Sequence, residues 1–224
     1  MLSIIDKKFI KAAQDNQLDE LKNLLDQGAD IHADDDYALR CSAAEGHLEV
    51  VKFLVKKGAD IHADNDGALI ETAIGGHLEI VKFLLSHGAN LRSDSDGALR
   101  NSAAHGHLEI VKFLIAHGAN VHINNDESLR RDSYYGHLNT VKYLLTQGAN
   151  IHAQGDEALR NAADRSHNDV WQLLSALIQE EKLLVAAVGS MPLVAAVGST
   201  GASSCFLGIP AVPVKLKKSQ RSKI

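Results

Sequence analysis

Histidine is the residue type that most invites a chemical interpretation of this sequence, because imidazole is the commonest metal ligand and a frequent general base. The chain has 12 histidines among its 224 residues. Most of them fall into two columns whose members are separated by thirty residues or a multiple of thirty: His32, His62, His122 and His152 in the first, and His47, His77, His107, His137 and His167 in the second.

These columns lack the geometry of a metal site. If each column repeats on stacked helical units, its neighbouring members lie about 10 Å apart, whereas zinc needs each ligand nitrogen within about 2 Å. His105 and His107 form the closest pair, and no further ligand accompanies them. We therefore predict no metal site and assign the histidines to hydrogen bonds within and between turns.

A catalytic constellation is also missing. The sequence has no Gly-rich phosphate loop, nucleophile elbow or Cys–His motif, and neither Cys41 nor Cys205 belongs to a metal-ligand motif. We expect a protein that is not an enzyme and holds no cofactor. The carboxylates recur in register instead of forming an isolated acid–base pair, in the column Asp36, Asp66, Asp96, Asp126 and Asp156.

Repetition is the strongest pattern in the chain. The triplet Gly-His-Leu returns at a spacing of thirty residues, and a leucine column and the aspartate column keep the same register. Three columns in one register are typical of a repeat architecture. The pattern predicts six units, near residues 8–37, 38–67, 68–97, 98–127, 128–157 and 158–182.

Each unit is expected to contain two short helices and a polar loop. In the second helix of one unit, Leu48, Val51 and Leu54 fall on one apolar stripe of helical period. Gly58 then ends this helix in the left-handed C′ conformation, and Asp36 is placed as the N-cap of the first helix. A pair this short cannot bury its apolar face alone, so the units must stack. The sequence therefore predicts an all-α helical repeat solenoid of about six helix pairs with a C-terminal non-repeat tail.

The stretch "GHLEVVKFLVKKGADIHA" from Gly46 to Ala63 resembles the second helix of ankyrin repeat proteins. Two departures stand out, because the usual period of that family is 33 residues and its Thr-Pro-Leu-His opening is replaced here by Tyr-Ala-Leu-Arg at 37–40. The thirty-residue units also resemble those of large families from giant DNA viruses of amoebae. The resemblance implies an ankyrin-type solenoid that acts as a non-enzymatic scaffold for protein–protein interaction.

Function is expected where the copies differ. In ankyrin proteins the two residues before Gly-His lie on the concave face and commonly contact partners. The fifth unit differs most, reading "SLRRDSYYGHLNT" over 128–140 where the fourth reads "ALRNSAAHGHLEI". Tyrosine and arginine are frequent interface hot spots, although two tyrosines could instead fill a packing irregularity in a decaying copy. The predicted partner-binding residues are Tyr134, Tyr135, Arg131, His105 and Arg165.

Charge is unevenly distributed along the chain. The formal net charge is −5, while the last ten residues, "KLKKSQRSKI", carry only positive charges. The remainder is therefore acidic, with much of its charge in loops such as 34–36. Acidic loops argue against nucleic-acid binding by the solenoid and suit a basic protein partner. The alternative is that these aspartates are solvated loop residues that end in an N-cap. We expect a monomer.

The segment 183–214 has no charge and contains "LVAAVGS" twice. Its length would permit a bilayer crossing, although several glycines and serines dilute its apolar character. A membrane-tethered adaptor anchored by 183–214 is therefore the alternative function. Disorder of residues 183–224, or docking of residues 182–188 onto the last repeat, remains open as well. The N-terminus has no evident signal peptide, so we expect a cytoplasmic protein, in the host cytoplasm if it is viral.

Overall fold

The computed structural model describes residues 2–189, and in this part of the chain every regular element is an α-helix. The predicted all-α class is therefore confirmed. The helices form six consecutive pairs, as the thirty-residue period predicts: α1 (Ile4–Gln14) with α2 (Leu18–Asp26), α3 (Ala33–Ala44) with α4 (Leu48–Lys56), α5 (Ala63–Gly75) with α6 (Leu78–Ser86), α7 (Ser93–Ala104) with α8 (Leu108–Ala116), α9 (Ile123–Tyr135) with α10 (Leu138–Thr146), and α11 (Ala153–Asp164) with α12 (Asn168–Gly189).

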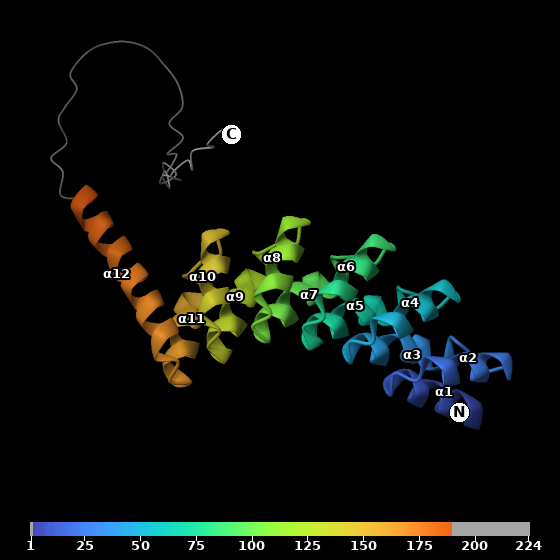
Figure 1. Cartoon of the computed structure of the whole chain (residues 1–224). Helices are drawn as coiled ribbons and strands as arrows, with labels where there is room; N and C mark the ends of the chain where they lie inside the picture. Colours follow the sequence, from blue (N-terminus) through green and yellow to red (C-terminus); the bar gives the residue numbers. More distant parts are fainter. Residues whose placement is uncertain (1, 190–224) are drawn as a thin grey trace, which may run out of the picture.

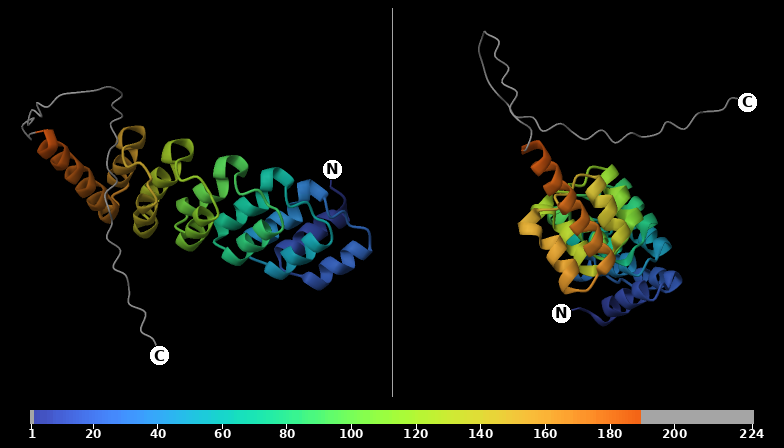
Figure 2. Two further views of the ribbon diagram at one scale, coloured as in Figure 1. Left: turned by 90° about the horizontal axis from the view of Figure 1, so that it is seen from above. Right: turned by 90° about the vertical axis from the view of Figure 1, so that its left-hand side faces the viewer.

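The pairs stack into two rows of helices (Figure 1). The odd-numbered helices form the first-helix row, in which α1 packs on α3, α3 on α5, and so on to α11. The even-numbered helices form the second-helix row and pack mainly on the first helix of their own unit. Figure 2 shows the units following one another along a single direction. Contacts are thus made between nearest neighbours, as in a solenoid.

The core is built from the faithful columns of the sequence. Leu54, Leu84 and Leu114 are fully buried, and Leu39, Leu69, Leu99 and Leu129 of the leucine column are buried beside them, while Leu159 in the last unit is partly buried. Ala43, Ala73 and Ala103 are also buried where successive first helices meet, and Ala163 in the last first helix is exposed. Small residues allow these helices to approach closely while the leucines fill the space between the two rows. The apolar stripe predicted from the sequence is therefore the core of the solenoid.

The second histidine column fastens each unit to the one before it. His77 Nε2 donates a hydrogen bond to the carbonyl of Ala44, one unit earlier, over 3.0 Å. Its ring occupies the space beside Gly46, where a Cβ atom would lie 2.5 Å from the imidazole. Gly46 also has a φ of +80°, which disfavours any other residue. Glycine and histidine are therefore paired across the unit boundary, and the same bond is made by His47, His107, His137 and His167.

The aspartate column fastens each first helix to the loop that leads into the next unit. Asp36 is buried, accepts a hydrogen bond from the backbone N–H of Asp60 over 2.9 Å, and lies 3.1 Å from Nδ1 of His32. The predicted N-cap role is therefore wrong for Asp36. An N-cap residue has extended backbone, whereas Asp36 has left-handed φ/ψ and no side-chain bond to the start of its own helix. Its carboxylate instead tethers the loop that leads from its own helix pair into the following unit, as those of Asp66, Asp96 and Asp126 do.

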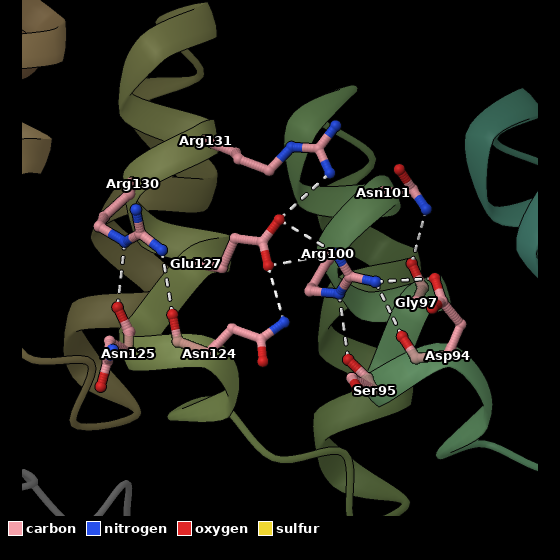
Figure 3. Close-up of polar contacts among 10 residues, drawn as sticks. All are labelled: Asp94, Ser95, Gly97, Arg100, Asn101, Asn124, Asn125, Glu127, Arg130 and Arg131. Atoms are coloured by element: carbon pink, nitrogen blue, oxygen red, sulfur yellow. Dashed lines mark hydrogen bonds and ion pairs between the residues drawn. The ribbon is translucent and has the colours of Figure 1, made fainter.

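Every unit boundary contains three consecutive left-handed residues, at 34–36, 64–66, 94–96, 124–126 and 154–156. Left-handed backbone costs an ordinary L-residue about 1–2 kcal/mol, and Asn and Asp, which dominate these positions, tolerate it best. In one boundary, Arg100 donates to the carbonyls of Asp94 and Ser95 and to the carboxylate of Glu127 in the next unit (Figure 3). Arginine thus satisfies carbonyls that the left-handed turn leaves free. The equivalent carbonyl bonds are made by Arg40, Arg130 and Arg160.

The last helix departs from the repeat. Other second helices end before a glycine, but α12 has the buried Ile178 at that position and continues to Gly189. The expected unit end at 182 therefore falls inside a continuous helix, which leans away from the second-helix row in Figure 1. His152 Nε2, at the loop of the sixth unit, bonds Glu181 over 2.7 Å and holds the extension.

The structure corrects one expectation for the tail. Leu183, Leu184 and Val185 are 62%, 63% and 72% exposed, so this part of 182–188 does not dock onto the last repeat. Helix α12 continues through these residues because Ile178 replaces the glycine that terminates the other second helices. None of the described helices is both long and apolar enough to cross a bilayer. The rest of the expected anchor, 190–214, and the basic end lie outside the described residues.

Unit three offers a natural test of the arginine, because Ile70 occupies the position of Arg100 there. Arg100→Ile should lower the free energy of unfolding by about 1–3 kcal/mol, since two carbonyls and the carboxylate of Glu127 lose a donor. Ile70→Arg should raise it by about 0.5–1.5 kcal/mol. Urea unfolding monitored by circular dichroism measures both.

The matched control is Lys112→Ile, which removes an exposed i,i+3 ion pair with Glu109 and should cost less than about 0.5 kcal/mol. If Arg100→Ile costs no more than this control, the arginine does not stabilise the turn.

Candidate functional site

The sequence-predicted residues all lie at the C-terminal ends of first helices. Tyr134 and Tyr135 end α9, Arg131 lies one turn earlier, and His105 and Arg165 follow α7 and α11. His105, Tyr135 and Arg165 occupy equivalent positions of successive units, and Arg131 and Tyr134 lie within one helical turn of Tyr135, so the five residues lie at the same end of the first-helix row. The sequence therefore placed the five residues on a common face, and the structure shows which of them make contact.

Three of the residues form a compact cluster. The guanidinium of Arg165 lies over the ring of Tyr134, 4.0 Å from its centroid. The rings of Tyr134 and Tyr135 meet edge to face at 5.0 Å, with an interplanar angle of 80°. Cation–π and edge-to-face contacts both favour a fixed arrangement of the rings. We call Tyr134, Tyr135 and Arg165 the tyrosine cluster.

Exposure separates the two tyrosines. Tyr135 is 48% exposed, while Tyr134 is half-buried under Arg165. The Tyr135 ring also lies nearly parallel to that of His137, with 6.4 Å between centroids. Tyr135 is therefore not a core residue that fills a packing irregularity. It presents a large aromatic surface to solvent from a supported position, as an interface residue does.

Among the described residues, no hydrogen bond, ring contact or cation–π contact joins His105 or Arg131 to the tyrosine cluster. His105 Nδ1 bonds the carbonyl of Asn101 over 2.9 Å, which leaves the ring exposed. Arg131 lies 3.5 Å from the carboxylate of Glu127, which also accepts a hydrogen bond from the guanidinium of Arg100 (Figure 3). Burial by itself raises the pKa of Glu127, but hydrogen bonds from Asn124 and Arg100 lower it below the ordinary value. Glu127 is therefore ionised and holds both arginines in place.

Sequence reasoning missed a buried polar group in α9, the helix that ends in the two tyrosines. Asp132 is fully buried in α9, and neither of its carboxylate oxygens has a hydrogen-bond partner among the described residues. The hydroxyls of Ser128 and Ser133 in the same helix are buried and unpartnered as well. In other units the position of Asp132 holds Ser42 or Ser102, whose hydroxyls donate to a carbonyl of their own helix. An aspartate in a column of small hydroxyl residues was the available signal.

Burial dictates the ionisation state of Asp132. Removal of its carboxyl from water raises the pKa to about 9, so the group is protonated at neutral pH. A buried polar group without a partner costs about 1–3 kcal/mol. The fifth unit therefore has the least satisfied core of the described units. Local rules of stability are often broken where a surface serves function.

The described residues offer little for catalysis. No three His, Cys, Asp or Glu side chains among them lie close enough together to hold a metal ion. Cys41 is buried, and burial raises the pKa of its thiol to about 11, which disfavours the reactive thiolate. The arrangement is suited to binding, because it presents rigid aromatic and cationic groups on a stable scaffold.

Comparison with known families agrees with the repeat pattern. Residues 9–65 and 58–125 match the family described as "Ankyrin repeats (3 copies)", and residues 133–156 match "Ankyrin repeat". The first two ranges together span more than half of the chain. The interval 126–132, which contains Arg131 and Asp132, lies between the matched ranges. A search of curated proteins finds no match.

Asp132 generates a prediction about pH. Its pKa is about 3.8 in the unfolded chain and about 9 in the folded one, so between these values the folded state binds the extra proton. The contribution of Asp132 to stability must therefore fall as pH rises through this window. Asp132→Ser, which restores the residue of units two and four, should raise the free energy of unfolding at pH 8 by about 1–3 kcal/mol.

The gain should shrink when unfolding is measured at pH 5. Asp132→Asn keeps the shape of the protonated acid without titrating, and exposed Asp169→Asn serves as the surface control. A gain from Asp132→Ser that is the same at pH 5 and pH 8 would show that Asp132 is not buried as a neutral acid.

Proposed function

Because the chain belongs to the ankyrin repeat family, we propose that it is a non-enzymatic scaffold that binds a protein partner through the exposed ends of its first helices. The binding surface is centred on Tyr134 and Tyr135 and extends to Arg131, His105 and Arg165. Ankyrin repeats generally serve protein–protein interaction, which supports the coarse assignment. The particular residues are the specific part of the proposal.

One observation carries the proposal, namely the exposed and supported aromatic surface of Tyr135. Aromatic side chains with two rotatable angles offer large contact area at a small entropic cost on binding. Tyr134 restricts that freedom further, because it packs against Tyr135 and is itself held under Arg165. Preorganised aromatic and arginine side chains are the usual centres of binding energy in an interface.

The acidic loops give weaker information about the partner. Asp34 and Asp64 are exposed, but they occupy left-handed positions that aspartate tolerates for backbone reasons. Their acidity therefore has a structural cause apart from recognition. A wholly basic partner consequently stays a prediction, as do the monomeric state and the absence of nucleic-acid binding by the solenoid. The cytoplasmic location, the resemblance to viral repeats and the tail-anchored alternative also stay predictions.

The double substitution Tyr134→Ala with Tyr135→Ala tests the surface. It should weaken binding of the natural protein partner by about 2–4 kcal/mol, because two hot-spot rings are removed. The thermal melt should change little, since the faithful leucine columns carry the packing. Partners are captured on the immobilised full chain from a lysate of its source, identified by mass spectrometry, and their affinity is measured by calorimetry.

The control is Trp171→Ala, because Trp171 is 43% exposed on α12 in the second-helix row. If a partner binds the double variant normally but does not bind Trp171→Ala, the binding surface lies on the second-helix row and the proposal is wrong. Unfolding of the double variant would show that the tyrosines belong to the core.

A further inference from the structure

The first-helix row also contains a cleft, at the opposite end from the tyrosine cluster. A cleft of about 120 Å³ opens between α1, α3 and α5 and is lined by Tyr37, Arg40, Cys41, Glu45 and Glu71, among others. Pockets for drug-sized ligands usually measure about 300–1,000 Å³. This cleft has room for the end of one side chain, not for a whole small molecule. Tyr37, which the sequence places in a loop, forms one of its walls.

The cleft carries a net negative charge. Arg40 is already engaged, because its guanidinium lies 2.5 Å from the carboxylate of Asp64, bonds two turn carbonyls and rests over the Tyr37 ring. Cys41 is neutral, as its raised pKa requires. Glu45 and Glu71 form no ion pair with any described residue. The two glutamates therefore determine what the cleft attracts, and a lysine or arginine end is the complementary group.

Repeat equivalence places this cleft and the tyrosine cluster on the same face. Glu45 occupies the column of His105, Tyr135 and Arg165, and Glu71 occupies the column of Arg131. The face is thus acidic over units two and three, and aromatic with mostly cationic groups over units four to six. Lys11 at the acidic end is paired with Asp15. At the other end, Asp164 in the column of Tyr134 is the one acid among the residues that occupy the columns of Arg131, Tyr134 and Tyr135 in units four to six. One surface therefore has two ends of opposite charge.

We propose that the partner presents an extended segment with a basic end and an acidic end, which lies across the first-helix row. Its basic side chain enters the cleft of Glu45 and Glu71, and its acidic end meets Arg165, because Arg131 is already paired with Glu127. An apolar residue between them packs on Tyr135. This inference rests on the proposed function and adds the polarity and the reach of the segment.

The spacing of the units sets the length of that segment. Glu45 and Arg165 are four units apart, which corresponds to about 40 Å at about 10 Å per unit. An extended chain advances about 3.3 Å per residue. The basic and acidic residues of the partner should therefore be separated by about twelve residues, in a fixed order along the chain, with the apolar residue between them.

Selection from a random 16-residue peptide library displayed on phage, with the full chain as bait, tests the polarity. Enriched peptides should carry Lys or Arg near one end and Asp or Glu about twelve positions away. Glu45→Gln with Glu71→Gln should weaken the best synthetic peptide at least tenfold in fluorescence anisotropy. The effect should vanish when the basic residue of the peptide is replaced with alanine. Reselection on Glu45→Lys with Glu71→Lys should enrich acidic residues at that end instead.

The matched control is Glu49→Gln with Glu79→Gln, which alters two exposed glutamates on the second helices α4 and α6 and should leave the affinity unchanged. If peptides require Tyr134 and Tyr135 but ignore Glu45 and Glu71, the polarity is wrong and the proposed function stands. If peptides ignore both sites, respond to the control variant, or cannot be selected at all, the polarity and the proposed binding face fail together.

Discussion

Each unit of this protein is completed by its neighbours. The carbonyl at the end of one first helix accepts a hydrogen bond from the histidine of the following unit, and the buried aspartate at the start of the same helix accepts one from a backbone N–H in the loop that leads to the following unit. The first bond crosses the boundary between two helix pairs, and the second fixes the loop that enters the next pair. The thirty-residue register of Gly, His and Asp follows from this requirement, because a displaced copy would leave buried polar groups without partners.

Stacking also determines where the sequence is free to vary. Positions that contact a neighbouring unit keep the same residue type from copy to copy, whereas the exposed ends of the first helices are not constrained by such contacts and vary. The fifth unit uses this freedom on its surface, with Tyr134 and Tyr135, and also departs from the pattern in its core, with Asp132. The unpartnered polar groups of the core thus lie in α9, the helix that carries the two tyrosines of the proposed binding surface. Sequences often sacrifice local stability where a surface has been shaped for function.

The sequence predicts whatever depends on helical periodicity alone, which includes the helix pairs, the leucine core and the common face of the variable residues. It does not predict features that depend on backbone handedness or on two units together. The run Asp34 to Asp36 was interpreted as acidity and an N-cap, although Asn65 and Gly155 at equivalent positions suit a left-handed turn. The cleft beside Glu71 arises only where three helices meet, so no single column of the sequence contains it.

The central claim is that faithful columns hold the solenoid together while varied columns on the first-helix row bind the partner. A scan of all single substitutions over residues 2–189, scored in parallel for folded abundance and for binding to one selected peptide, tests it most directly. We expect substitutions that lose binding but keep abundance to gather at the exposed ends of α3, α5, α7, α9 and α11. If they gather on the second-helix row or on α12 instead, the assignment of the binding face is contradicted.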